Sequence, residues 1–284
     1  MTDTVTMFYP DMYHGLEDQR NFPFNDGDVA VVGFPKSGTS WIQVMLTNMY
    51  DDWGNHKLPL SKVPSLHGDG NDFPTMHYYG YETALALESP RLMKSHLRRE
   101  YFPARWPEHG KVVHITRNPK DVCVSFYFES AGFAELSKGK VKLPTDFDGF
   151  VEAFTGGEVA FSPYVDNIAS WWNFEHPNLC KLVYEDFRHE PRAALEKVAQ
   201  FLGKPVTEER LTEVAEKGLF ENMKDNDYRF QINHVDLREG TDKPFVRKGK
   251  IGGWRDYLTM SQSEVIDREI VGPLEVQGIH LNYG

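Results

Sequence analysis

The stretch GFPKSGTSW, Gly33 to Trp41, constrains this chain more than any other segment. It ends a β-branched run, Asp28–Phe34, and leads into apolar residues at helical spacing, so we expect a strand, a tight loop and a helix. Its glycines are spaced as in the phosphate-binding loop G-x-x-x-x-G-K-[ST], where backbone N–H groups and the helix dipole hold an anion. The lysine, however, lies inside the loop, at position 36. The pattern predicts either a broken triphosphate site or a working site for another phosphate.

The alternation of strand and helix patterns continues along the chain. Further strands are expected over Pro90–Leu97, Val112–Thr116 and Cys180–Phe187. Helices are expected from Thr39, from Pro119 behind the cap Asn118, and over Phe147–Phe154, Ala160–Phe174, Pro191–Leu202 and Glu208–Lys217. The segments Asp51–Ser89 and Asn226–Gly253 lack periodicity and are expected to form ordered caps. This order predicts an α/β fold with a central, mostly parallel sheet flanked by helices.

Bulk composition excludes several classes of protein. The chain has 284 residues, 40% hydrophobic and 26% charged, which suits one domain over residues 1–284. Its net charge of -11 argues against a general binder of nucleic acid or anionic membranes. It shows no signal peptide, no apolar run of about 18 residues, and no H-E-x-x-H or paired C-x-x-C motif. We therefore expect a cytoplasmic enzyme or binding protein without a metal.

A second candidate feature is Lys94-Ser95-His96, at the end of an expected strand. Alternate strand residues share a face, so Lys94 and His96 project together near the carboxyl edge of the sheet, where α/β sites form. A neighbouring cation favours the neutral form of histidine, which suits a general base. Taken alone, a strand histidine is more often structural than catalytic.

Two further segments carry positive charge where an anion could bind. Arg117 ends the third expected strand, ahead of a capped helix that bears Ser125. A salt bridge from Arg117 to Asp121 is the structural alternative. Late in this acidic chain, PFVRKGKIGGW places Arg247, Lys248, Lys250 and Arg255 among glycines, although such runs are usually solvated.

Five ordered segments together resemble the cytosolic sulfotransferase family. FPKSGTSW resembles its 5′-phosphosulfate loop, and Lys94–Leu97 is similar to its catalytic K-[ST]-H-L segment. Arg117–Asp121 with Ser125 is similar to its 3′-phosphate segment, and Val183–Asp186 to its Y-E-D stretch. Arg247–Gly249, followed by Gly252 and Trp254, resembles its R-K-G-x-x-G-D-W motif. The matches run from about Asp28 to Glu264 in family order.

The resemblance implies a cofactor, 3′-phosphoadenosine 5′-phosphosulfate, and no metal. It implies catalytic roles for His96 as general base and for Lys36, Lys94 and Ser125 around the sulfuryl group. It implies that the nucleotide is bound by Lys36, Ser37, Gly38, Thr39, Ser40, Trp41, Arg117, Ser125, Tyr184, Gly218, Leu219, Phe220, Met223, Arg247, Lys248 and Gly249. The reaction implied is in-line transfer to a hydroxyl or amine of a small, lipophilic acceptor such as a phenol or alcohol.

The chain also departs from the family pattern. Gly218 stands where the family has a hydroxyl residue, and Gly253 replaces the aspartate of G-D-W. The family's dimer motif appears in altered form over Arg255–Glu264, so a homodimer is expected there. The acceptor could be lined by Tyr78, Tyr79, Tyr81, Phe128, Phe133 and Trp171, which core packing would explain equally well. A metal-dependent P-loop kinase or NTPase and a non-catalytic nucleotide-binding protein are the alternative functions.

Overall fold

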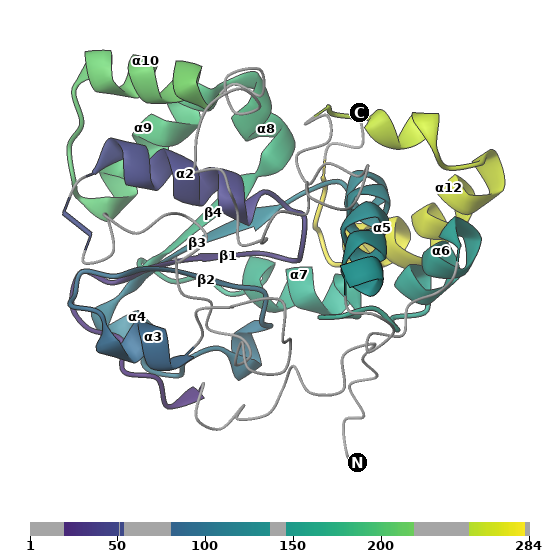
Figure 1. Cartoon of the computed structure of the whole chain (residues 1–284), viewed down its shortest axis with the longest axis horizontal. Coiled ribbons are helices and arrows are strands. Elements are labelled where there is room, and N and C mark those ends of the chain that lie inside the picture. The colour runs from purple at the N-terminus through teal and green to yellow at the C-terminus, as the bar shows by residue number, and fades with distance from the viewer. Residues whose placement is uncertain (1–19, 51, 54–80, 137–145, 219–249, 282–284) are drawn as a thin grey trace.

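Four parallel strands form the centre of the molecule, in the order β2-β1-β3-β4 (Figure 1). The computed structural model describes residues 20–50, 52–53, 81–136, 146–218 and 250–281. The strands in this part of the chain are β1 Val29–Val32, β2 Leu92–Ser95, β3 Lys111–Thr116 and β4 Leu179–Val183. β1 pairs with β2 and β3, and β3 pairs with β4, in parallel register throughout. The predicted α/β fold with a mostly parallel sheet is confirmed.

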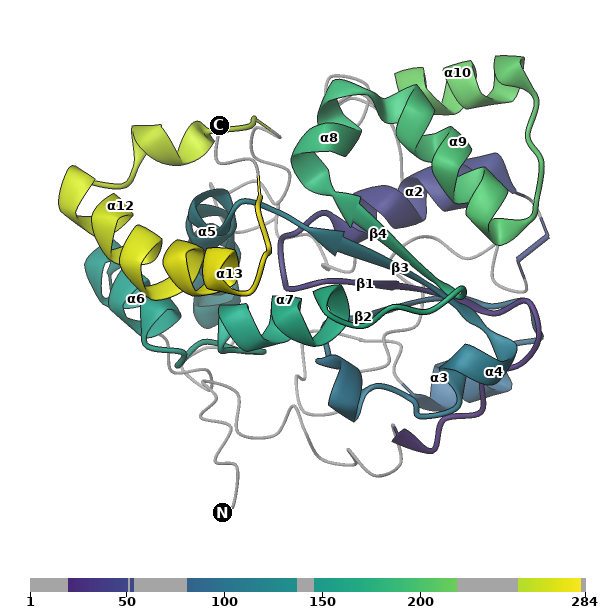
Figure 2. The same cartoon turned by 180° about the vertical axis from the view of Figure 1, so that it is seen from behind.

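Helices cover both faces of this sheet (Figures 1 and 2). One face packs against α2 Thr39–Met49, α8 Tyr184–His189, α9 Pro191–Leu202 and α10 Glu208–Lys217. The opposite face packs against α3 Tyr81–Ala86, α4 Trp106–His109 and α7 Tyr164–Trp172. β1 is buried on both sides, with Val29 and Val31 in the first cluster and Ala30 and Val32 in the second. Its continuous apolar sequence follows from this double cover, as in other parallel sheets.

A third group of helices packs beside the sheet and shares one apolar cluster. It contains α5 Pro119–Leu136, α6 Phe147–Thr155, α12 Met260–Ile266, the π-helical η5 Asp267–Val271 and α13 Gly272–Val276. Short 3₁₀ turns, η2 Arg99–Tyr101 and η4 Gly253–Asp256, complete the described elements. Phe34 and Leu97, each two residues beyond the end of a strand, belong to this cluster. The C-terminal helices therefore lie next to the edge where the strands end (Figure 2).

Three sequence predictions need correction. The fourth strand ends at Val183, and Tyr184 already begins α8 instead of continuing the strand to Phe187. The helix expected from Ala160 starts at Tyr164, because Phe161 has φ 65 and Pro163 is extended, and neither conformation propagates a helix. Within Asp51–Ser89, expected to be irregular, Tyr81–Ala86 forms α3. Most of that segment and of Asn226–Gly253 lies outside the described residues.

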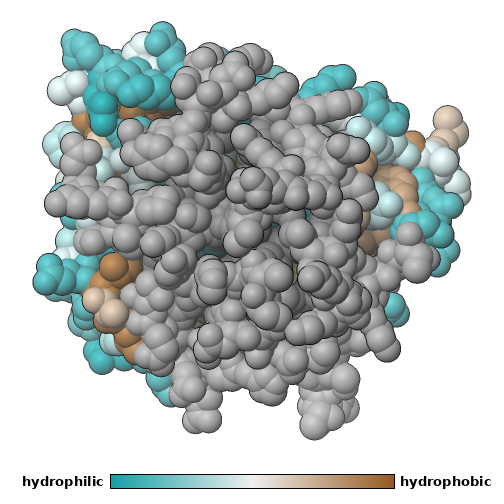
Figure 3. All heavy atoms as spheres, viewed as in Figure 1, coloured by the Kyte–Doolittle hydropathy of each residue, from teal (hydrophilic) through white to brown (hydrophobic). Residues whose placement is uncertain are grey.

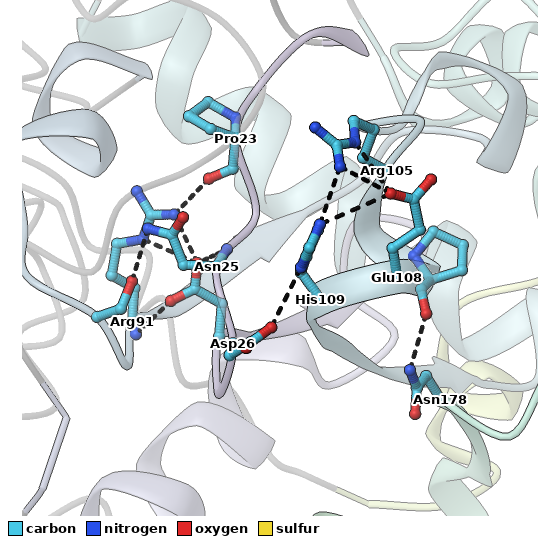
Figure 4. A network of polar contacts seen from close by, with 11 residues as sticks. Pro23, Asn25, Asp26, Arg91, Arg105, Glu108, His109 and Asn178 are labelled. Carbon is cyan, nitrogen blue, oxygen red and sulfur yellow. Dashed lines mark hydrogen bonds and ion pairs between the residues drawn. The ribbon is translucent and has the colours of Figure 1, made fainter.

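A buried ion pair joins the beginnings of β1 and β2. Arg91 donates to Asp28 at 3.0 and 2.5 Å, and the two side chains are 2% and 0% exposed. Arg91 also donates to the carbonyls of Pro23 and Ala84, so each nitrogen of its guanidinium group has a hydrogen-bond partner (Figure 4). Asp28 in turn accepts the backbone N–H groups of Arg91 and Asn25. This network fixes the amino-terminal edge of the sheet, opposite the edge at which the candidate site lies.

The outer sides of the covering helices are expected to be hydrophilic, and α10 shows this. The outer side of α10 is hydrophilic, at the upper left of Figure 3, as expected for a helix that buries only Leu211, Val214 and Ala215. Among the described residues, no helix combines the length and apolar character needed to cross a membrane.

Candidate active site

All four strands deliver a candidate site residue at their carboxyl ends. Gly33 follows β1, His96 follows β2, Arg117 follows β3 and Tyr184 follows β4. Because parallel strands end at the same edge of a sheet, these residues come from distant parts of the chain to one place. The tertiary fold thus brings the four motifs that follow the strands into a single candidate site.

The loop between β1 and α2 depends on its two glycines. Gly38 has φ 108, and a Cβ there would lie 2.8 Å from Cδ2 of Tyr184. A Cβ on Gly33 would lie 2.4 Å from the carbonyl oxygen of Ile115. Both distances are too short for a side chain, so glycine is required for sterics at either end of the loop. The loop is therefore pressed against β3 and α8, and α2 begins directly behind it at Thr39.

Two groups near this loop are buried donors without hydrogen-bond partners among the described residues. They are Oγ of Ser37 and Nε of Arg117. Nη1 of Arg117 donates to the carbonyl of Lys36 at 3.1 Å, and its guanidinium lies 4.2 Å from the ring centre of Tyr184. Buried polar groups are nearly always paired, so unpaired donors here fit a site that receives an anionic ligand.

Asp121 does not pair with Arg117, in contrast to the structural alternative raised by the sequence. Its carboxylate accepts the backbone N–H groups of Gly252 and Trp254 at 2.8 and 2.9 Å. Arg117 is therefore left for other contacts, and the start of α5 is tied to the C-terminal segment. Ser125 lies half-buried on the same helix, two turns after its start.

Lys36, Lys94 and His96 form one electrostatically coupled cluster. Burial and the charge of Lys94 lower the pKa of His96 to about 3, with Lys36 contributing in the same direction. Burial also lowers the pKa of Lys94 to about 8, although Glu129 opposes this shift. Nδ1 of His96 lies 2.6 Å from the carbonyl oxygen of Gly33. A carbonyl only accepts, so Nδ1 carries the proton and Nε2 carries the lone pair of a neutral imidazole.

Trp41, Tyr184 and Gly218 also come together. The indole N–H of Trp41 donates to the carbonyl of Gly218 at 2.9 Å, and its ring meets that of Tyr184 edge to face. A Cβ on Gly218 would lie 1.7 Å from Cε of Met45, so a larger residue would displace that side chain. Gly218 thus packs closely against the end of the Met45 side chain of α2. Ser40 is half-buried in the first turn of α2.

Six predicted cofactor residues lie outside the described part of the chain: Leu219, Phe220, Met223, Arg247, Lys248 and Gly249. Of the aromatic residues considered for the acceptor, Trp171 belongs to the core, because it is fully buried and donates to the carbonyl of Leu97. Phe128 is half-buried and packs against Tyr257. Tyr78 and Tyr79, and the side chains of Tyr81 and Phe133, lie outside the described residues.

A comparison with protein-family models decides the class. Residues 26–273 match the model described as Sulfotransferase domain. The chain belongs to this sulfotransferase family. The match covers every strand, the loop at Gly33 and both lysines of the cluster.

Curated relatives within the family agree over most of their length. The chain is 32% identical over 273 residues to Sulfotransferase 1B1 of Mus musculus, covering 91% of this chain and 87% of the relative. It is 29% identical over 271 residues to Sulfotransferase 1A1 of Canis lupus familiaris, covering 93% of this chain and 89% of the relative.

Two solved structures share the fold. A retinol dehydratase in complex with retinol and PAP has a TM-score of 0.77 at 24% identity, covering 96% of this chain and 89% of that one. A mouse sulfotransferase complexed with PAP has a TM-score of 0.73 at 21% identity, covering 95% of this chain and 91% of that one. Among the described residues, no three His, Cys, Asp or Glu side chains gather as a metal ion would require.

Two acidic residues of the site were given no role from the sequence, although Glu185 lies within the Val183–Asp186 stretch noted there. Glu129 forms an ion pair with Lys36, with Oε1 3.0 Å from Nζ. Its only sequence signal is its position four residues after Ser125, which places both on one face of a helix. Glu185 is fully buried beside the start of α5 and accepts the N–H of Asn118 at 3.0 Å, while its Oε2 has no partner among the described residues.

The unusual setting of Glu185 predicts a pH-dependent stability. Burial raises the pKa of this carboxyl to about 7, although Asn118 and Arg117 oppose the shift. The folded chain therefore binds a proton that the unfolded chain releases above its ordinary pKa of 4.5. We expect the free energy of unfolding to fall by up to about 3 kcal/mol as the pH rises from about 4.5 to above 7.

Glu185→Gln should remove this slope, because glutamine is neutral at every pH and its carbonyl can still accept from Asn118. Urea denaturation between pH 5 and pH 8 measures the change in the free energy of unfolding with pH. The exposed Glu209→Gln serves as a control that should keep the wild-type pH dependence. Equal slopes in wild type and Glu185→Gln would contradict the assignment.

Proposed function

We propose that this sulfotransferase uses 3′-phosphoadenosine 5′-phosphosulfate as its donor, with His96 as the general base toward the acceptor. The observation that carries this proposal is the convergence of Lys36, Lys94 and a neutral His96 beside a phosphate-type loop. Two cations next to a base suit the transfer of an anionic group to a nucleophile that must lose a proton.

The residues present fit such a nucleotide. The loop Lys36–Trp41 would hold its 5′ end, using buried Ser37 Oγ and the start of α2 as donors. Arg117 and Ser125 would hold the 3′-phosphate, together with Arg247, Lys248 and Gly249. Trp41, Tyr184 and the segment from Gly218 through Leu219 and Phe220 to Met223 would frame the adenine. The bound nucleotide supplies an activated sulfuryl group.

His96 would receive the acceptor proton at Nε2. Its Nδ1–H···O=C bond to Gly33 fixes the ring and its tautomer, so the lone pair is presented in a set direction. The low pKa of His96 keeps its imidazole neutral at physiological pH before the acceptor binds. As the acceptor oxygen or nitrogen becomes negative, the proton that it loses turns His96 into a cation beside the transferring group.

Lys36 and Lys94 would stabilise the negative charge that moves onto the departing phosphate oxygen. A lysine with a pKa near 8 remains largely protonated at neutral pH, so Lys94 contributes a positive charge there. Ser125 would add a hydroxyl from α5.

The proposal also covers the type of acceptor, the partners and the oligomeric state. The acceptor is a small molecule with a hydroxyl or amine, and no metal, nucleic acid or membrane partner is needed. A homodimer through Arg255–Glu264 is supported by the exposed Met260 at the start of α12, 80% exposed. A single domain over residues 1–284 and a cytoplasmic location stay predictions.

Nucleotide binding tests the donor assignment. Calorimetry with 3′-phosphoadenosine 5′-phosphate and with AMP should show much tighter binding of the first ligand, by at least about tenfold. The reason is that the 3′-phosphate adds charge-assisted hydrogen bonds to Arg117. Equal affinities would contradict the proposed cofactor. Magnesium-dependent turnover of ATP that is lost on Lys36→Ala would favour the kinase or NTPase alternative instead.

A further inference from the structure

The chain leaves the sheet immediately before His96. β2 ends at Ser95, whose carbonyl accepts the N–H of Gly33 at 3.2 Å. The next carbonyl, that of His96, accepts instead from Nδ2 of Asn167, at 2.9 Å. Asn167 belongs to α7, which lies at the end of the sheet where the strands finish (Figures 1 and 2). The backbone of the proposed base is therefore held by a side chain from a helix 71 positions further along the chain.

One face of α7 holds the stretch that follows β2. Asn167, Ser170 and Trp171 are spaced by three and four positions, so their side chains share a face of the helix. The indole N–H of Trp171 donates to the carbonyl of Leu97 at 2.9 Å, and Oγ of Ser170 accepts the backbone N–H of Arg99 at 3.1 Å. Of the three contacts, the one from Asn167 reaches the histidine itself.

The same amide also holds the residue that packs against the imidazole. Nδ2 of Asn167 donates to the carbonyl of Phe161 at 3.3 Å. The ring of Phe161 meets the imidazole of His96 edge to face, with 5.3 Å between the ring centres. Phe161 has φ 65, a conformation that is unfavourable for a residue with a side chain and persists only where surrounding contacts hold it. Asn167 therefore fixes both the backbone of His96 and the aromatic ring that lies against it.

A primary amide is the group that these two carbonyls require. Its nitrogen carries two N–H donors, and here one is directed to each carbonyl. The reversed amide would set its oxygen against two other oxygens, so the contacts decide which end is nitrogen. Oδ1 of Asn167 is buried without a partner among the described residues, and the whole residue is 0% exposed. Burial of such a group is unfavourable unless its hydrogen bonds are made, and the two donors make them.

We propose that Asn167 is a positioning residue for His96, whose amide holds the backbone of the base so that Nε2 stays directed at the acceptor. The inference rests on the proposed function, in which His96 takes the acceptor proton. The bond from Nδ1 to the carbonyl of Gly33 fixes the rotation of the ring, and Asn167 fixes the chain from which the ring projects. Both constraints matter because proton transfer requires hydrogen-bond geometry, and a displacement of about 1 Å can cost about 10²-fold in rate.

The Asn167→Leu variant removes both donors at a similar side-chain size. With 4-ethylphenol as acceptor and the sulfated nucleotide as donor, kcat should fall by about 10–100-fold. The KM for 4-ethylphenol should stay within about twofold of the wild type. The affinity for 3′-phosphoadenosine 5′-phosphate, measured by calorimetry, should be unchanged, because the amide is directed to the two carbonyls and not to a ligand.

Asn178→Leu is the matched control. The amide of Asn178 also donates to a backbone carbonyl 71 positions away, that of Pro107 at 2.9 Å, but at the amino-terminal edge of the sheet (Figure 4). Its loss should leave kcat within about twofold of the wild type.

A second background separates positioning from a general structural role. In the His96→Ala protein there is no base to hold, so adding Asn167→Leu should lower the residual rate by less than about twofold. Equal losses in the two backgrounds would make Asn167 a structural residue only. An unchanged kcat in the single variant would also overturn the inference.

Folding of the variants is checked by their binding of 3′-phosphoadenosine 5′-phosphate. If Asn167→Leu does not fold, Asn167→Ala, which adds no bulk, is measured in its place. Failure of both to fold would assign Asn167 to the core and overturn the positioning role. Near-normal turnover by His96→Ala, or a wild type that neither binds the nucleotide nor sulfates 4-ethylphenol, would instead strike the proposed function, so the two failures are distinguishable.

Discussion

Replacing His96 with alanine is expected to lower kcat by about 10²–10⁴-fold, the usual contribution of a positioned general base. The neutral imidazole is held by the carbonyl of Gly33 and is influenced by the charge of Lys94, which suits it to accept the proton. The affinity for 3′-phosphoadenosine 5′-phosphate should remain at the wild-type value, because the proposed role of His96 is toward the acceptor and not the nucleotide. Single-turnover rates and calorimetry measure the two quantities separately.

The matched control for this variant is His109→Ala. His109 lies at the surface, where it contacts Asp26 and Arg105 at the opposite edge of the sheet (Figure 4). Its removal should leave kcat unchanged. In addition, the acid limb of kcat/KM in the wild type should lie well below the ordinary histidine pKa of 6.5, since kcat/KM reports the free enzyme. Near-normal turnover by His96→Ala would remove His96 from the catalytic role.

The largest effect on stability is expected from Arg91→Met. Removing one partner of a buried ion pair leaves the other charge uncompensated and costs about 3–5 kcal/mol. Here the stranded group would be Asp28, which is 0% exposed and holds β1 to β2. Urea denaturation at constant pH, with the slope m checked for two-state behaviour, measures the loss.

Arg105→Met provides the comparison for an exposed pair. Arg105 and Glu108 are 67% and 58% exposed, and pairs of this kind contribute about 0–1 kcal/mol. The double variant Asp28→Asn with Arg91→Met should lose less than the sum of its two single changes, because each alone strands a buried group. If Arg91→Met costs no more than Arg105→Met, the buried pair has no special part in holding the sheet.

Two side-chain pairs, one at the site and one at the opposite edge of the sheet, could not have been found from the sequence because their partners are remote. Lys36 and Glu129 are 93 positions apart, and Asp28 and Arg91 are 63 positions apart. No local spacing rule connects residues at such separations. Glu129 also lies in the middle of a helix whose sequence reads as ordinary core and surface positions. Only the packing of α5 against the loop after β1 brings its carboxylate to the lysine.

The opposite case is the histidine segment. Lys94 and His96 are alternate residues, so the period of a strand already predicts that they share a face, and the structure couples them as expected. The aromatic residues Phe128 and Trp171 show the limit of such reasoning. Composition alone left them open between an acceptor pocket and the core, and burial together with the bond to Leu97 assigns Trp171 to the core.

The sequence by itself determined the fold class, the order of its motifs and the family, because strand and helix periodicity and short motifs are local properties of the chain. It also determined that the loop after β1 suits an anion, through two glycines at fixed spacing. The tertiary structure decided which side chains meet at the carboxyl edge of the sheet and which tautomer His96 adopts. It also decided that Glu129 forms an ion pair with Lys36. These three features depend on the distances between remote segments and on how deeply the side chains are buried. Distance and burial set the pKa values and the charge pairs, and no local sequence pattern encodes them.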